Sequence, residues 1–222
     1  MPTDRDLVTK CYPIELAAFE ELVRSLTPEQ WITPTRCEGW RVCDVAAHVA
    51  GTLDNIVNGR FDGLGTPEVT AAEVSDREGH TAGEVADEIH KWADAAAGLL
   101  AAFDDAAWAG PSPAGAIPTL GDGVESLWFD TWMHGEDIRA ATGLPPVTTG
   151  DSVGAGVRHV AVVLESQGWG PAVLELDRQD AVAVGDGSGR HVTGDAYQFV
   201  LAATGRIAAS TIGEDETVNI YR

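Results

Sequence analysis

The segment from Trp128 to Ile138 is mostly apolar, yet it holds an aspartate and a histidine four residues apart. Side chains at positions i and i+4 project from one face of a helix, so Asp130 and His134 share a face. A carboxylate and an imidazole on a buried face need partners, because uncompensated burial is costly. The helical count places both on a stripe of otherwise apolar or uncharged residues: Leu120, Val124, Leu127, Thr131, Ile138 and Ala141.

A second apolar stripe carries another histidine. His48 falls in line with Val45, Val49 and Ile56 in a segment that follows Gly39-Trp40-Arg41. Two imidazoles and one carboxylate on two facing helices suit zinc or another divalent ion and leave positions open for water or substrate. The spacing is also compatible with a site that holds no metal. Asp130 and His134 would then form a hydrogen bond with each other, and His48 would be a core histidine with hydrogen-bond partners in the protein. The residues alone leave these interpretations open.

Helical periodicity predicts four long helices before residue 143. The stretch between the second and third helices, residues 61–79, is rich in glycine and proline and is predicted to be a long connection that closes over a site. Long helices with inward-facing ligands favour a bundle that builds its site between helices. The predicted helices are Pro13–Leu26, Arg41–Asn58, a third opened by the capping box Thr81–Glu84, and Gly121–Thr142.

The segment from Gly143 to Gly150 is the clearest domain boundary, because it combines glycines and prolines with no apolar period. Beyond it the pattern changes to short apolar runs that predict a small α+β domain. The glycine-rich segment Gly185–Gly189 is interpreted as a hairpin turn. The expected elements are a helix over Asp151–Glu165 capped by Asp151 or Ser152, strands at Ala172–Leu176, Ala181–Val184 and from Val192, a helix over Asp195–Ile207, and a closing strand over Thr217–Tyr221.

The chain is strongly acidic, with 35 Asp and Glu against 14 Lys and Arg and a formal net charge of −21. This charge repels phosphate backbones and anionic lipid, so nucleic-acid and membrane partners are not expected. The first six residues lack the basic and apolar regions of a signal peptide, which predicts a cytoplasmic protein.

Three cysteines do not form a disulfide framework and lack the spacing of a structural zinc site. Cys43, near a predicted helix start, is a candidate for a lowered pKa. The favoured interpretation of Cys11, Cys37 and Cys43 is nonetheless as small buried residues. None lies at ligand spacing with the histidines, so a reactive thiol would have to come from a cofactor.

Several blocks resemble the mycothiol-dependent maleylpyruvate isomerase family, part of the DinB-like superfamily of metal-binding four-helix bundles. The block Trp132–Arg139 is similar to the family's fourth-helix motif, with a Trp-x-His core followed by Asp-Ile-Arg. The other similar blocks occur in the family's order: Leu26–Trp31, Pro34–Val42, Val45–His48 and, more weakly, Gly194–Arg206.

The resemblance implies a DinB-like metal-binding bundle over residues 1–142 and a small α+β domain over 150–222. It implies that His48, Asp130 and His134 hold a divalent metal, zinc being the first choice, and that mycothiol or another low-molecular-weight thiol is the cofactor. The family usually has glutamate where this chain has Asp130. Aspartate is a competent ligand but is one methylene shorter.

The resemblance further implies that a metal-activated thiolate adds to a small electrophile, as a cis–trans isomerase or an S-transferase does. Arg206 is the candidate residue for holding a carboxylate, of substrate or cofactor; it is otherwise a surface arginine at a helix C-terminus. Asp137 is expected either to orient His134 or to pair with Arg139. Two other classes stay open: a hydrolase that uses metal-bound water, and a binding protein without turnover.

Overall fold

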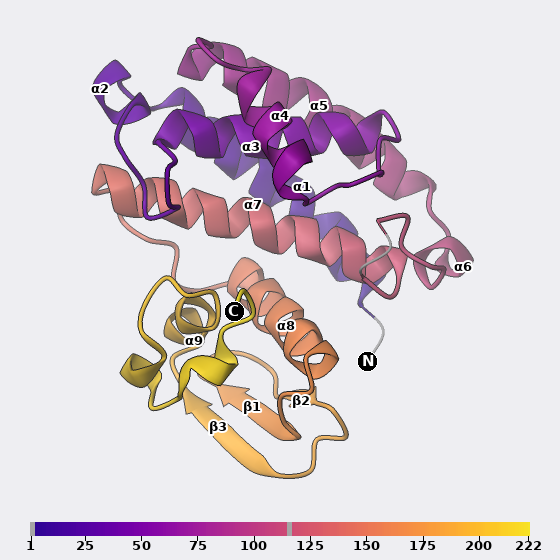
Figure 1. Cartoon of the computed structure of the whole chain (residues 1–222). Helices are drawn as coiled ribbons and strands as arrows, with labels where there is room; N and C mark the ends of the chain where they lie inside the picture. Colours follow the sequence, from indigo (N-terminus) through magenta and orange to yellow (C-terminus); the bar gives the residue numbers. More distant parts are fainter. Residues whose placement is uncertain (1–2, 115–116) are drawn as a thin grey trace. The chain divides into compact units, whose positions relative to one another are not determined.

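The computed structural model describes residues 3–114 and 117–222. Met1 and Pro2, which belong to the N-terminal stretch considered above, lie outside the described residues. The described chain divides into two compact units, residues 1–146 and 147–222, and is mostly helical with a small C-terminal sheet (Figure 1). No helix in these ranges is long and apolar enough to cross a membrane.

The first unit is built on four long helices, of which α1 and α3 each pack against both α5 and α7. Figure 1 shows these helices running lengthwise beside one another. Three shorter helices lie in the connections, and one of them, α4, packs on α3. The helices are α1 (Arg5–Arg24), α2 (Pro28–Trp31), α3 (Val42–Val57), α4 (Pro67–Ser75), α5 (Ala82–Ala102), α6 (Asp105–Trp108) and α7 (Leu120–Thr142).

Side-chain caps set the ends of the long helices. The Thr81 side chain accepts a hydrogen bond from the Glu84 backbone N–H at the start of α5, and Thr119 does the same for Asp122 at the start of α7. Gly143 ends α7 in the left-handed conformation with φ +70°, which glycine adopts without a steric cost. The predicted bounds of α3, and the predicted starts of α5 and α7, are therefore confirmed to within one residue.

The first helix is longer than the sequence predicted. It begins at Arg5, because the Asp4 side chain accepts a hydrogen bond from Leu7 N at 3.1 Å, so a start at Pro13 is wrong. Pro13 lies inside the helix. A proline there removes one backbone hydrogen bond, and the burial of Val8 and Tyr12 in the preceding turns offsets that loss.

The connection between α3 and α5 also differs from the expectation, because it contains the helix α4. Thr66 caps it by accepting a hydrogen bond from Val69 N, and Pro67 occupies its first turn, where a missing N–H is harmless. Arg77, just past its end, donates to the Glu73 carbonyl at 2.9 Å and to Glu88 of α5 at 2.9 Å. These bonds fix α4 between two of the long helices.

The second unit is a three-stranded sheet with helices. The strand order is β2-β1-β3, with β1 antiparallel to β2 and parallel to β3. Helix α8 contacts α9 and β2. The elements are α8 (Asp151–Ser166), β1 (Ala172–Leu176), β2 (Val182–Val184), β3 (Arg190–Gly194), α9 (Ala196–Ala203) and the 3₁₀ turns η1 (Ala209–Ile212) and η2 (Glu216–Val218).

Four expectations for this unit are wrong. The helix expected over Asp195–Ile207 is α9, which ends at Ala203. Gly150, not Asp151 or Ser152, occupies the N-cap position of α8. The segment Gly185–Gly189 is no hairpin turn, because it joins β2 to β3 on opposite sides of β1. In place of a closing strand the chain forms η2, where the Asp215 side chain accepts from Thr217 N and stabilises the turn.

We expect Gly51→Ala to lower the free energy of unfolding by about 1–3 kcal/mol, the usual cost of overpacking. A methyl group at Gly51 of α3 would lie 2.5 Å from Glu73 Cβ of α4, so α4 would have to move away. The measurement is the urea midpoint. The matched control is Gly98→Ala on α5, where the new methyl meets no atom within 4 Å and a gain of about 0.5–1 kcal/mol is expected. Equal midpoints for the two variants would contradict the close α3–α4 packing.

Candidate metal centre

The three predicted ligands lie together in the first unit. His48 comes from α3, and Asp130 and His134 come from successive turns of α7. His48 Nε2 is 3.6 Å from Asp130 Oδ2, and His134 Nε2 is 3.4 Å from Asp130 Oδ1. Among the described residues, these three form one of two groups whose ligand atoms all lie within 4.8 Å of one another.

The other nitrogen of each imidazole is held by a second carboxylate. His48 Nδ1 lies 2.7 Å from Glu73 Oε2, and His134 Nδ1 lies 3.1 Å from Asp137 Oδ2. A carboxylate accepts a hydrogen bond from Nδ1–H and so favours the neutral tautomer that leaves the Nε2 lone pair free. Both Nε2 atoms therefore face Asp130, where each can bind a metal ion or, when protonated, donate to the carboxylate.

Glu73 is the residue of the candidate site that the sequence did not reveal. It lies on α4, which the sequence analysis treated as part of a connection, and its side chain is 3% exposed. Asn55 Nδ2 donates to Glu73 Oε1 at 2.7 Å, which fixes the carboxylate from the α3 side. The cap signal Thr66-Pro67 was available in the sequence, but nothing in the residue pattern paired Glu73 with His48.

Asp137 contacts the imidazole of His134, which was the first of the two arrangements expected for it. Its carboxylate is fully buried and lies against His134 Nδ1, while Arg36 Nε donates to its other oxygen at 2.6 Å. Arg139, the alternative partner, forms an ion pair with Glu136 at 3.4 Å. Asp137 thus orients His134, and Arg36 compensates the charge of Asp137.

The cysteines depart from the expectation of three buried residues, since Cys11 is buried whereas Cys37 and Cys43 are partly exposed. Cys37 Sγ lies 3.2 Å from Asp137 Oδ2, and Cys37, His134 and Asp137 form the second candidate ligand group. The sequence analysis placed no cysteine within reach of a histidine as a fellow ligand, and for Cys37 this expectation is wrong. Burial and the neighbouring Asp44 raise the pKa of Cys43, which contradicts a thiol activated by the helix N-terminus.

The first group is the better metal centre. Asp137 already neutralises Arg36 and orients His134, so its lone pairs serve those partners. Cys37 would reach only the Nδ1 side of the imidazole, where that carboxylate lies. By contrast, both Nε2 atoms of the first group converge on Asp130.

The electrostatics of the first group depend on Asp130. Burial alone would lower the pKa values of both histidines, but Asp130 outweighs it, helped by Glu73 at His48 and by Asp137 at His134. The pKa of His48 is thereby raised, and that of His134 is raised well above its usual value. Burial would raise the pKa of Asp130, and the two imidazoles instead hold it well below its usual value. Without a metal the cluster therefore binds protons that a metal ion must displace.

The surroundings of the cluster are aromatic and apolar. The Trp40 ring lies 5.4 Å from the His48 ring and 6.3 Å from the His134 ring, between centroids. Each histidine side chain is 12% exposed, whereas Asp130 is 34% exposed. Asp130 and His48 line a cavity of about 620 Å³, so Asp130 is not sealed in the core as its stripe suggested. A small molecule can therefore reach the cluster.

Arg206, the fourth predicted site residue, lies in the second unit just after α9. Its Nη1 donates to the Thr204 carbonyl at 3.3 Å, at the C-terminal end of that helix. This contact fits an arginine that interacts with the last carbonyls of a helix. Its role toward a substrate or cofactor stays a prediction.

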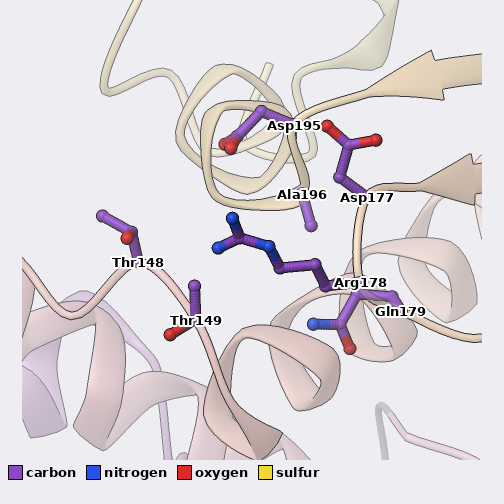
Figure 2. A pocket seen from close by; sticks show the side chains of 7 residues that line it. All are labelled: Thr148, Thr149, Asp177, Arg178, Gln179, Asp195 and Ala196. Atoms are coloured by element: carbon purple, nitrogen blue, oxygen red, sulfur yellow. The ribbon is translucent and has the colours of Figure 1, made fainter.

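A second hollow, of about 270 Å³, lies within the second unit (Figure 2). Arg178 extends into it, and Thr149 and Asp195 lie nearby. Asp195 already caps α9 by accepting from Gln198 N, and Arg178, Thr149 and Asp195 are exposed, so their charges and hydroxyls remain hydrated. The buried carboxylate–histidine cluster is the stronger candidate for chemistry.

Comparisons with known proteins identify the family and the fold of the chain. A model of the mycothiol maleylpyruvate isomerase N-terminal domain matches residues 12–139. No curated protein matches the sequence. A crystal structure of the mycothiol-dependent maleylpyruvate isomerase is similar, with 16% sequence identity and a TM-score of 0.68. A crystal structure of a histidine-to-alanine mutant of that enzyme is similar with 15% sequence identity and a TM-score of 0.66.

Each alignment covers 96% of this chain and 95% of the other, so the fold is shared over nearly the whole length. The family match spans more than half of the chain and includes His48, Asp130 and His134. The chain therefore belongs to the mycothiol maleylpyruvate isomerase N-terminal domain family.

Proposed function

We propose that this protein is a thiol-dependent metalloenzyme in which His48, Asp130 and His134 hold one divalent ion inside a DinB-like four-helix bundle. The observation that carries the proposal is the arrangement of the imidazoles. Both Nδ1 atoms are held by carboxylates, while both Nε2 atoms face the same aspartate.

The distances within the cluster suit a metal better than direct hydrogen bonds. Nitrogen–oxygen hydrogen bonds are about 2.7–3.2 Å long, so separations of 3.4 and 3.6 Å are too long for good ones. Ligand atoms at about 2.0–2.1 Å from a tetrahedral zinc are roughly 3.3 Å apart. Two imidazoles and one carboxylate also match the ligand types of catalytic zinc sites and leave a fourth position open.

The proposed reaction is thiolate addition to a small electrophile, by an isomerase or an S-transferase. The family match supports mycothiol as the thiol. A bound divalent metal would supply a thiolate at neutral pH by removing the proton of a coordinating thiol. Glu73 and Asp137 would keep both imidazoles in the coordinating tautomer, and the cavity beside Asp130 would admit the electrophile.

Arg206 is proposed to hold a carboxylate of the thiol cofactor or of the substrate. A guanidinium binds a carboxylate through two parallel hydrogen bonds, which a −21 protein needs if it is to retain an anionic ligand. Residues 1–142 would then form the metal-binding domain and residues 150–222 the accessory domain of a cytoplasmic enzyme.

We expect His48→Ala, Asp130→Ala and His134→Ala each to lose the stoichiometric metal that the wild-type protein binds, as elemental analysis after gel filtration would show. Asp130→Glu should retain it, because a carboxylate is kept. His90→Ala is the matched control, since His90 is exposed and pairs with Glu20. Full metal content in both His48→Ala and His134→Ala would rule out this ligand set.

Glu73→Gln and Asp137→Asn should each weaken metal binding about 10- to 100-fold, the usual effect of removing a carboxylate that supports a histidine ligand. The measurement is competition with a chromophoric chelator. Glu68→Gln, at an exposed position of the same helix α4 as Glu73, should leave the affinity unchanged. If the Gln variants at 73 and 68 bind metal alike, Glu73 does not support the ligand.

Thiol dependence is tested with cobalt in place of the native metal. Addition of mycothiol should produce an intense near-ultraviolet charge-transfer band, because the thiolate coordinates the open position. Cys37→Ser should give the same band, since Cys37 lies on the Nδ1 side of His134. No band, together with equal turnover of electrophiles without thiol, would favour a hydrolase that uses metal-bound water.

A further inference from the structure

The cavity beside the cluster is large and apolar. It measures about 620 Å³, within the range of pockets that enclose whole small molecules. Its wall comes from α1, α3, α5 and α7, from the connection after α3 and from the segment before α7. Leucine, isoleucine, valine and phenylalanine side chains make up much of it, including Leu53, Ile56, Phe61, Leu100 and Leu127.

The charged groups of this wall are confined to the cluster. Among the described lining residues there is neither lysine nor arginine, and Asp130 is the acidic one. A ligand carboxylate placed against this wall away from the cluster, and so away from the proposed metal ion, would lose its hydration without a compensating cation.

The remaining polar groups of the wall are neutral hydroxyls. Burial raises the pKa of the Tyr12 phenol, so it stays protonated, and the Thr52 hydroxyl lies near the Glu73 carboxylate. Groups of this kind can donate a hydrogen bond to a carbonyl or ether oxygen but cannot neutralise an anion. The lining therefore selects for an uncharged ligand with a large apolar part.

We propose that the substrate is an uncharged electrophile whose alkyl or aryl body fills this cavity while its reactive carbon lies beside His48 and Asp130. The proposal rests on the thiol-dependent function and narrows it to apolar substrates such as terminal epoxides. In that reaction a C–S bond forms, the epoxide C–O bond breaks, and the resulting alkoxide takes up a proton equivalent to the one lost by the thiol. No oxidant or reductant is consumed.

The first test measures binding without turnover, so that it does not depend on the thiol. Calorimetric titration of the metal-loaded protein with 2-butanone, 2-hexanone and 2-octanone should give dissociation constants that fall by about fourfold per methylene. 7-Oxooctanoate, which keeps the ketone of 2-octanone and carries a carboxylate at the far end of the chain, should bind at least tenfold more weakly than 2-octanone. 7-Oxooctanoate binding as tightly as 2-octanone, or no dependence on chain length, would overturn the proposal.

Two substitutions locate the binding in this cavity. Ser126→Phe on α7 should fill part of it and weaken 2-octanone binding at least tenfold, because Ser126 lines the wall. Leu127→Arg should raise the affinity for 7-oxooctanoate, because it adds a cation to the wall. The matched control, Ala140→Phe, places the same ring at an exposed position of α7 and should change neither affinity. Unchanged 2-octanone binding in a folded Ser126→Phe variant would exclude this cavity.

The second test separates this proposal from the function on which it rests. With mycothiol and metal present, the wild-type protein should open 1,2-epoxyoctane faster than 1,2-epoxybutane and should discriminate against maleylpyruvate. Thiol-dependent turnover restricted to dicarboxylates would refute the apolar substrate and keep the thiol enzyme. Chain-length-dependent ketone binding without any thiol-dependent turnover would support the apolar site and refute the thiol enzyme.

Discussion

The site is organised by one carboxylate that lies between two imidazoles. Asp130 faces His134 along α7 and His48 across to α3, and its charge is what keeps both histidine pKa values above the level that burial would set. Such a cluster is stable only if its remaining atoms also have partners. Glu73 and Asp137 provide them at the two Nδ1 atoms, and Asn55 and Arg36 in turn satisfy those carboxylates. The packing of α3, α4 and α7 is therefore coupled to the geometry of the site.

The sequence predicted the ligands better than their supports, for a physical reason. A spacing of four on an apolar helix brings Asp130 and His134 together whatever the rest of the chain does. Predicting His48 required only a second amphipathic helix that faces the first. Predicting Glu73 would have required a tertiary contact between a short helix and α3. The hydrophobic pattern of α4 is too weak to reveal which side of that helix is buried.

The errors in the second unit have a similar origin. Alternating residues at 217–221 suggested a strand, but a strand requires a partner edge, and the local cap from Asp215 favours a 3₁₀ turn. The segment 185–189 has the residues of a tight turn, yet β2 and β3 lie on either side of β1, which short-range sequence does not specify. The helices α3, α7 and α8 and the strand β1, whose patterns are local, were located to within one residue.

The placement of Glu73 has a consequence for how the chain can vary. Connections between helices normally accept insertions and deletions, because their closure entropy grows only slowly with length. Here the connection supplies Glu73 to His48 and Phe61 and Leu64 to the cavity wall. A change in its length would shift the register of those side chains against α3. The span from Gly59 to Gly79 thus contributes to the candidate site and its cavity, and grafting a foreign loop there would replace part of both.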